Sequence, residues 1–396
     1  MNKSFILLII TYLFVFSPVQ PSLGIGGIKF LYLLVPLLFS NVAKKNIIIT
    51  KDVFLSYLIL FLFIIVRSSF ASGDATRLLY DATISFIEGY FIAHIVIFLH
   101  EKYSFSLVIT LRRCLYIASF SALLCLISPS IKSIVDDYLS LPNMVEGQDF
   151  RGFGIGVEMT FSYSISIAII YILLLFYSSG VKKLLFLLPF IVVSIMINAR
   201  TGILVLLLGL LLYLIKTKIL QKPRIIIMIC LCVLLLSTIP FSMLSKSDTG
   251  GFAIDFYDQI VLILSGDFVD VEDNNLSLLL KAFEFYLPNT ITEWLLGSGL
   301  VVGDEGKIIV LDSGFFYDLY FGGVLFIFIC FLIPLFFYNY LKSIHKYFAL
   351  FLILSCVILN IKGPFVPFAH GFKLITLVCM YFMLHPNIIE RQSTHK

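Results

Sequence analysis

Residues 182–218 read KKLLFLLPFIVVSIMINARTGILVLLLGLLLYLIKTK, and this stretch determines whether the chain forms one long helix here or a hairpin of two. Two apolar runs flank a polar string at residues 198–202, and a basic cluster closes each outer end. As one helix, residues 184–215 would rise about 48 Å, which exceeds a hydrocarbon layer of about 30 Å. A hairpin of two short spans places both basic clusters on the cytoplasmic side of a membrane, as the positive-inside rule favours. Arg200 then lies at the outer tip of the hairpin.

The composition is typical of a membrane protein. Of 396 residues, 60% are hydrophobic and 13% are charged, whereas a soluble globular protein carries about 25% charged residues. We predict an all-α polytopic membrane protein with about twelve transmembrane helices, which occupy about 240 positions. Little room remains for a nucleotide-binding cassette, a Rossmann domain or a nucleic-acid module. The apolar runs cover residues 4–20, 28–43, 52–67, 78–99, 108–128, 156–177, 183–199, 201–215, 224–241, 316–340, 346–361 and 365–384.

Basic residues predict the orientation of these spans. With the amino terminus in the cytoplasm, most of the 28 Lys and Arg residues fall in inner segments, as the positive-inside rule requires. Both termini are then cytoplasmic, and the net charge of +4 reflects topology rather than an acidic ligand. The first run is followed by no small-x-small cleavage site, so we expect it to remain as an uncleaved span. Residues 1–396 form a single integral membrane domain in this interpretation.

Two outer loops are long, residues 129–155 and the acidic residues 242–315. Within the second, residues 276–287 and 291–296 are apolar but too short to span, and the only tryptophan lies in the latter. We expect both to be helices at the outer interface. The acidic stretch 267–275 lacks the residue order of a calcium loop and is interpreted as a solvated loop. The seven cysteines lie in or at the ends of apolar runs without disulfide or zinc spacing, so no metal site is expected.

Ionisable side chains near membrane depth are costly, and each is therefore a functional candidate. Arg151 opens the string Arg-Gly-Phe-Gly-Ile-Gly-Val-Glu158 at the head of the sixth span. Its glycines allow close approach of a ligand or a neighbouring helix. Arg151 is either an interfacial residue that reaches lipid phosphate or part of a phosphate clamp. Arg200 has the same two interpretations, because a guanidinium beside the amino-terminal amides of a helix suits a phosphate.

The remaining candidates flank the outer ends of the spans or lie within them. His370 and Lys373 share one face of the last helix, as a packed pair or as a site. Glu88 and His94 lie on different faces of the fourth span and are not expected to pair. The other outer candidates are Arg67, Arg77, Asp312 and Asp318.

Three strings resemble the O-antigen polymerases of the Wzy type and, more distantly, the O-antigen ligases. The first two are Arg151–Glu158 and Asn198-Ala-Arg-Thr-Gly-Ile-Leu204, which is similar to the family's Ser-Arg-Thr/Gly hairpin tip. The third is Leu296-Gly-Ser-Gly-Leu300, followed by Asp312-Ser-Gly-Phe-Phe and by Gly322-Gly323. The order of these strings matches over roughly residues 140–330, while the first four spans match only in being hydrophobic. Ligases carry His followed by Asn where this chain has Asp312 and Ser313, so the resemblance favours a polymerase.

The resemblance implies a glycosyltransferase that joins undecaprenyl pyrophosphate-linked repeat units on the periplasmic face of a bacterial inner membrane, making O-antigen or a related polysaccharide. Arg151 and Arg200 would bind the pyrophosphate, and Asp312 or Glu158 would accept the proton of the attacking hydroxyl. Arg77, His370 and Lys373 are secondary candidates. No cofactor or metal is expected, and the partners are the lipid-linked glycans, membrane lipid and a chain-length regulator protein. A flippase or other secondary transporter, a ligase, and a lipid-binding structural subunit remain the alternatives.

Overall fold

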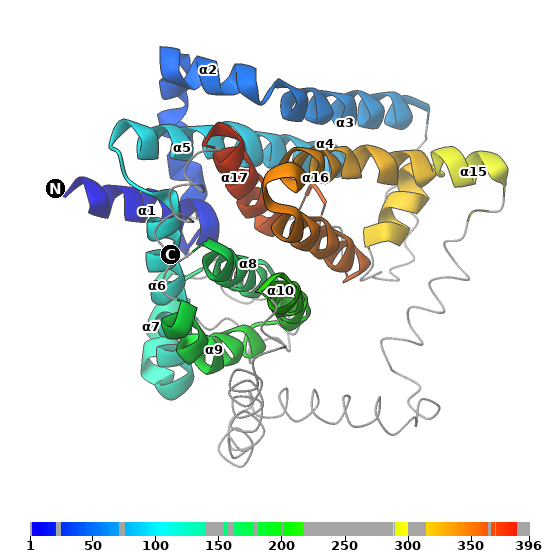
Figure 1. The fold of residues 1–396 in the computed structure, drawn as a ribbon. Coiled ribbons are helices and arrows are strands. Elements are labelled where there is room, and N and C mark those ends of the chain that lie inside the picture. The colour runs from blue at the N-terminus through cyan, green and yellow to red at the C-terminus, as the bar shows by residue number, and fades with distance from the viewer. Residues whose placement is uncertain are drawn as a thin grey trace, which may run out of the picture. The chain divides into compact units, whose positions relative to one another are not determined.

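A computed structural model describes residues 2–20, 25–70, 76–139, 154–156, 161–177, 181–199, 201–217, 288, 290–299, 314–362, 366–368 and 370–385. These residues are almost entirely helical (Figure 1). The chain divides into two compact units, which are described separately. The first unit comprises Met1–Leu31, Tyr103–Val271 and Gln392–Lys396, and the second comprises Tyr32–Lys102 and Glu272–Arg391.

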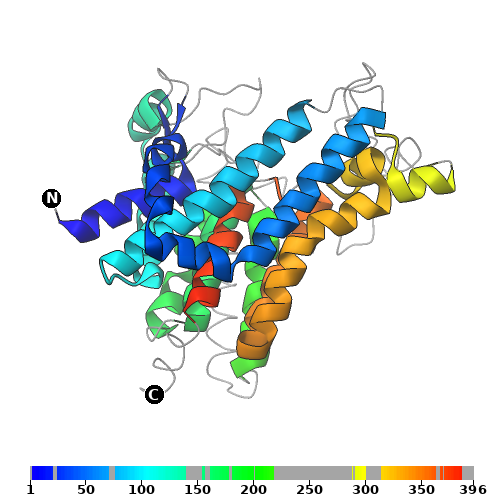
Figure 2. The same cartoon turned by 90° about the horizontal axis from the view of Figure 1, so that it is seen from above.

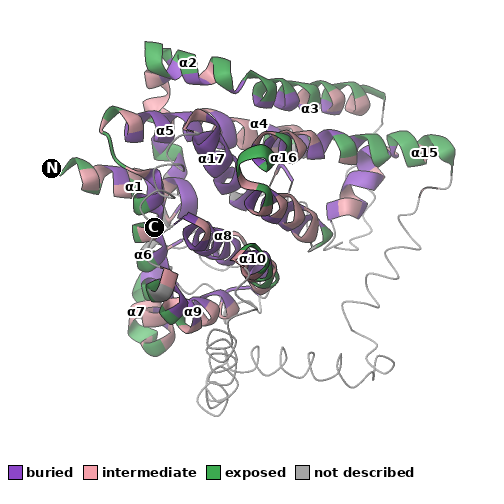
Figure 3. Ribbon diagram, in the orientation of Figure 1, coloured by how far each residue is buried: buried purple, intermediate pink, exposed green. Residues whose placement is uncertain are grey.

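The first unit is built around α8 (Phe161–Tyr177), most of whose side chains are buried (Figure 3). Neighbouring helices contact α8 from several directions. They are α1 (Lys3–Phe16), α6 (Leu107–Ile127), α9 (Val181–Met196) and α10 (Thr201–Thr217). A short antiparallel pair, β1 (Val19–Gln20) and β2 (Ile25–Gly26), follows α1. The helix α7 (Pro129–Leu139) lies within the segment that the sequence predicts as an outer loop.

The second unit has α17 (His370–Leu384) at its centre, and the described side chains of α17 are nearly all buried (Figure 3). The unit also contains α2 (Asn41–Ile49), α3 (Lys51–Phe70), α4 (Thr76–Phe86), the π-helical η3 (Ile87–Ile92), α5 (Ala93–Lys102), α15 (Ile291–Leu296) and α16 (Gly314–Lys362), of which α2, η3, α5 and α16 contact α17. The 3₁₀-helix η2 (Gly27–Phe39) runs from the first unit into the second. Figure 2 shows α3 running alongside α16, with which it is in contact.

Within the described ranges, four helices are long and apolar enough to cross a membrane, or five if η2 and α2 count as one bent span. The four are Lys51–Phe70, Leu78–Lys102, Leu107–Ile127 and Gly314–Ile361, and the bent pair turns by 97°. Five further apolar helices are shorter, among them α9 and α10. The run at 224–241 and the stretch at 276–287 lie outside the described residues, whereas the expected helix at 291–296 coincides with α15.

The last long helix is interrupted rather than continuous. His345 has non-helical backbone angles (φ −143°, ψ 62°), and the Asn360 Nδ2 atom donates to Asp318 Oδ2 at 3.0 Å. Residues 42 positions apart on a straight helix would be separated by about 63 Å. The chain therefore folds back near His345, as the predicted runs 316–340 and 346–361 require.

Two helical boundaries differ from the sequence prediction. Residues 44–49, predicted as part of an inner loop, are helical in α2, because Ser40 caps that helix by accepting a hydrogen bond from the Ala43 amide at 3.3 Å. Residues 129–139 form α7, where the sequence predicts loop. Its first residue is Pro129, which suits a helix start because its fixed φ and missing amide hydrogen cost nothing there.

Candidate functional site

Of the side chains that the resemblance assigns to the site, the structure describes that of Lys373 and places the others as follows. Arg151, Glu158, Arg200 and Asp312 lie outside the described residues. Arg77 lies in the first turn of α4 and His370 is the first residue of α17, and only their backbone is described. The site can therefore be built from the elements around these residues and from Lys373.

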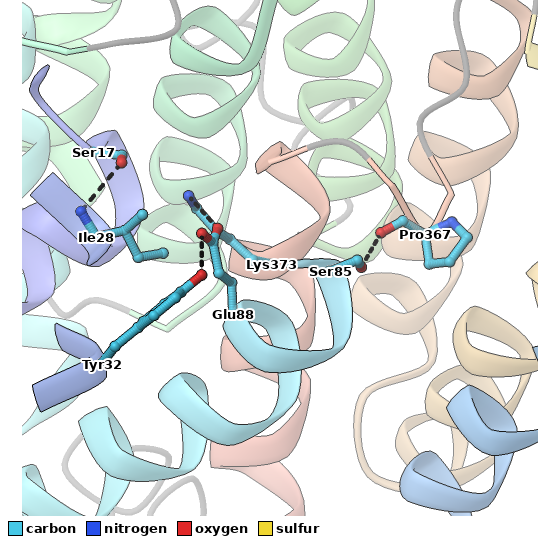
Figure 4. Close-up of polar contacts among 7 residues, drawn as sticks. All are labelled: Ser17, Ile28, Tyr32, Ser85, Glu88, Pro367 and Lys373. Atoms are coloured by element: carbon cyan, nitrogen blue, oxygen red, sulfur yellow. Dashed lines mark hydrogen bonds and ion pairs between the residues drawn. The ribbon is translucent and has the colours of Figure 1, made fainter. Parts of the chain in front are cut away.

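Lys373 is buried in the second unit and forms an ion pair with Glu88. The Lys373 Nζ atom lies 3.5 Å from Glu88 Oε2, and the side chains are 4% and 3% exposed. The Tyr32 hydroxyl donates to the other carboxylate oxygen at 3.0 Å (Figure 4). The pair thus joins η2, η3 and α17, three segments that are far apart in the sequence.

Glu88 lies on η3, where the backbone adopts π-helical geometry. Short π-helical segments inside α-helices frequently occur at functional sites. A close approach accompanies this one, since a Cβ atom at Gly89 would come within 2.9 Å of the Tyr57 hydroxyl. The charged pair is therefore enclosed by tightly packed helices rather than held at a surface.

The partner of Lys373 is not the one that helical spacing favours. The sequence groups it with His370 on one face of the last helix, whereas the structure pairs it with a residue 285 positions away. Glu88 and His94 belong to different hydrogen-bond networks, as predicted. The only signal in the sequence was that both Glu88 and Lys373 stand in apolar runs, where a buried charge needs an opposite charge.

A second polar network lies at the junction of α2 and α3. The Thr50 hydroxyl is 2.8 Å from His94 Nε2 and 3.0 Å from the Tyr90 hydroxyl. Nearby, Asn46 of α2 donates through Nδ2 to Oε2 of Glu101 on α5 at 3.0 Å. His385 Nε2 lies 3.0 Å from Glu101 Oε1. These contacts fasten the end of α17 to α2 and α5, and they indicate a structural role.

Asp318 is a completely buried acid near the start of α16. Besides Asn360 Nδ2, its surroundings include the loop before α17, because the Val366 amide donates to Asn360 Oδ1 at 3.1 Å. The second carboxylate oxygen, Oδ1, has no hydrogen-bond partner among the described residues. The sequence predicts Asp318 as an outer-side candidate but does not predict Asn360 as its partner.

Two glycine strings of the second unit meet in a junction formed by Gly297, Ser298 and Gly299 against residues 320–323. The amides of Ser298 and Gly299 donate to the carbonyl oxygens of Tyr320 and Phe321 at 2.7 and 2.8 Å. A Cβ atom at Gly297 would lie 2.5 Å from the Gly322 nitrogen. Only glycine permits such an approach of two backbones. We call these residues the glycine junction.

Arg67 fastens α3 to the glycine junction. Its Nε and Nη2 atoms donate to the carbonyl oxygens of Leu296 and Gly297, each at 2.7 Å. The guanidinium lies in the last turn of α3 and at the end of α15, so it complements the negative ends of two helices. The planar fork of arginine can reach two neighbouring carbonyls at once. Arg67 is thus a structural anchor of this junction.

The glycines after Arg151 pack against protein side chains. A Cβ atom at Gly156 would lie 2.7 Å from Tyr163 Cδ2. Between Gly154 and Gly156, the Ile155 carbonyl accepts from the Tyr12 hydroxyl at 2.7 Å, and the Ile155 amide donates to Ser121 Oγ at 3.2 Å. The described part of this string therefore serves close packing on α1, α6 and α8, one of the two uses that the sequence allows for its glycines.

The break between α9 and α10 falls at the predicted hairpin tip. Asn198, Ala199 and Thr201 are all buried, and Asn198 Nδ2 donates to the Ser194 carbonyl at 3.1 Å. A Cβ atom at Gly202 would lie 2.9 Å from Ser164 of α8. The residues on both sides of Arg200 are packed into the first unit, where the sequence predicts an outer tip.

The chemistry available to the described residues is that of charges and hydrogen bonds. Among them, no three His, Cys, Asp or Glu side chains gather closely enough to hold a metal ion. The five described cysteines are buried and form no disulfide. Comparison of the chain with family models, curated proteins and solved structures found no match.

Proposed function

We propose that this chain is a membrane-embedded polymerase of undecaprenyl pyrophosphate-linked oligosaccharide repeat units, acting on the periplasmic face of a bacterial inner membrane. One observation carries the proposal. The strings Gly297–Gly299 and Gly322–Gly323, which the resemblance quotes as successive motifs, form one backbone junction fastened by Arg67. The junction requires both glycine strings, because their backbones approach closely. This requirement supports the view that the strings are a motif rather than a chance succession of glycines.

In this proposal the junction fixes the start of α16, two residues after Asp312 in the sequence. The acceptor hydroxyl of one lipid-linked repeat attacks the anomeric carbon of the growing glycan. Its proton passes to a carboxylate, Asp312 or Glu158, and undecaprenyl pyrophosphate leaves. Arg151 and Arg200 bind that pyrophosphate and stabilise the negative charge that develops on it. No cofactor enters this reaction.

A secondary transporter such as a polysaccharide flippase is the second candidate, and one observation favours it. The Glu88–Lys373 pair is buried among helices, and buried charges of this kind mark transport pathways in many membrane proteins. The bent pair of η2 and α2 is also typical of transporters with broken helices.

The location and length of the accumulated glycan in cells that lack the protein distinguish the candidates. A polymerase defect leaves single lipid-linked repeats on the outer leaflet, and a flippase defect leaves them on the inner leaflet. A ligase defect leaves full-length polymer on the lipid carrier. Accumulation on the inner leaflet, or of full-length carrier-linked polymer, would refute the proposal.

Substitution then tests the proposed phosphate clamp. Arg151→Ala and Arg200→Ala should each abolish polymer at an unchanged protein level, and Lys should rescue only partly because it lacks the planar fork. Arg113→Ala is the matched control, since Arg113 is an exposed cation that bonds Ser4 Oγ at 2.6 Å on the predicted inner side. Full-length polymer from both lysine variants would show that general electrostatics suffices.

A further inference from the structure

An apolar groove lies between α6 and α9 in the first unit. The two helices are joined where Ser194 Oγ donates to the Ser119 carbonyl at 3.2 Å. The groove, with a volume of about 1090 Å³, is lined by one side of each helix. Its lining includes Phe120 and Ile127 from α6, and Phe186 and Phe190 from α9.

The side chains that line this groove are turned away from the core of the unit. Phe186 is 76% exposed, Ile127 is 78% exposed and Phe120 is 63% exposed. Large apolar side chains gathered in a concave surface of this kind mark a binding site for an apolar chain. On helices of this hydropathy, that chain is the hydrocarbon tail of a lipid.

Charge distinguishes this groove from an ordinary lipid-facing surface. Of the described residues that line it, Lys183 alone carries a charge. It lies in the first turn of α9, where the positive end of the helix dipole disfavours a cation unless an anion is close. The sequence also predicts that Lys183 belongs to a basic cluster at the cytoplasmic face. An anionic headgroup at the groove's Lys183 end would complement both the side chain and the helix end.

We infer that the groove between α6 and α9 binds an anionic phospholipid, with its acyl chains along Phe120, Phe186 and Phe190 and its phosphate at Lys183. The volume of the groove, about 1090 Å³, slightly exceeds the range for small-molecule sites, about 300–1,000 Å³, and accommodates acyl chains. This inference does not depend on the proposed enzymatic activity.

Fluorescence quenching by brominated lipids tests it on the full-length protein. Trp294 is the only tryptophan, so a Trp294→Phe background carrying Phe186→Trp reports on the groove alone. The protein is placed in phosphatidylcholine vesicles that contain acyl-brominated phosphatidylglycerol or acyl-brominated phosphatidylcholine at the same mole fraction. Since one lysine near a membrane contributes about 1 kcal/mol toward an anionic lipid, we expect brominated phosphatidylglycerol to be preferred about fivefold. Adding Lys183→Gln should remove that preference.

The matched control is Leu207→Trp on α10, a residue of the same unit that is 57% exposed and does not line the groove. Both brominated lipids should quench it equally. Equal quenching of Phe186→Trp by the two lipids would overturn the inference, as would a preference that survives Lys183→Gln. Absence of quenching at Phe186→Trp, with normal quenching at Leu207→Trp, would also overturn it.

Discussion

Neutralising Lys373 should destabilise the protein more than neutralising both members of its ion pair. Lys373→Met leaves the Glu88 carboxylate buried. Of the contacts with Lys373 and Tyr32, the carboxylate then keeps the hydrogen bond from the Tyr32 hydroxyl. Removal of one partner of a buried ion pair costs about 3–5 kcal/mol. Because the hydrogen bond from Tyr32 remains, we expect a loss of about 3 kcal/mol.

The double variant Glu88→Gln with Lys373→Met removes both charges. The glutamine oxygen can still accept from Tyr32, so we expect this variant to lose only about 1 kcal/mol. The double variant should therefore unfold at a higher temperature than Lys373→Met, by about 2–3 °C for a chain of 396 residues. A coupling of this size and sign is the mark of a direct interaction between the two side chains.

Buried cysteines provide the assay. Cys114, Cys125, Cys330, Cys356 and Cys379 are buried and form no disulfide, so a thiol-reactive dye becomes fluorescent as the detergent-solubilised protein unfolds. Lys342→Met is the matched control, because Lys342 is exposed, where its Nζ donates to Asn339 Oδ1 at 2.8 Å and lies over the Tyr338 ring at 5.8 Å. It should shift the midpoint by no more than about 1 °C. A double variant that melts at or below the temperature of Lys373→Met would refute the reasoning.

Three further outcomes are expected. Gly323→Ala should destabilise the protein by at least about 1 kcal/mol, because Gly323 has φ +66° and a Cβ atom there would collide with the Leu295 backbone; the same dye measures it, and an unchanged midpoint would contradict the described packing. A cysteine at Thr292 should react with a membrane-impermeant reagent applied from outside, whereas one at Ser343 should not. Both positions are exposed, and the predicted topology places them on opposite sides of the membrane. The reverse labelling would overturn that topology. Asp312→Asn should retain protein in the membrane and lose most polymer, because an amide cannot take the proton; near-normal polymer would shift the search for a base to Glu158 or His370.

Local rules predicted the helices well where a basic cluster or a polar string interrupts an apolar run. The break near His345 follows Lys342, and the break at residues 197–199 coincides with the polar string of the hairpin. The bend between η2 and α2 was not predicted, because residues 44–49 carry two lysines that favour a loop interpretation, while the Ser40 cap and Pro36 decide the local backbone.

The partners of the buried charges lay beyond what spacing along one helix can predict. Helical periodicity relates Lys373 to His370, but it contains no information on Glu88, which is brought to Lys373 by packing of separate helices. Asn360 and Asp318 are likewise joined by the fold-back of α16. The glycines at 297, 299, 322 and 323 belong to strings that the resemblance quotes in succession, and the structure brings these strings into backbone contact.

The bond between Asp318 and Asn360 has a consequence for how the chain is made. Asp318 emerges from the ribosome 42 residues ahead of its partner, so the first half of α16 enters the bilayer carrying a solitary acid. An acid in a membrane helix makes insertion less favourable, by up to about 2.5–3.5 kcal/mol at the helix centre and by less near an end, where Asp318 lies. Membrane insertion of the first half of α16 is thus less favourable until the second half has been synthesised. Asn360 then contributes to insertion as well as to the stability of the finished fold. The Val366 amide donates to the Asn360 side chain, so the segment just before the last helix joins the same set of hydrogen bonds.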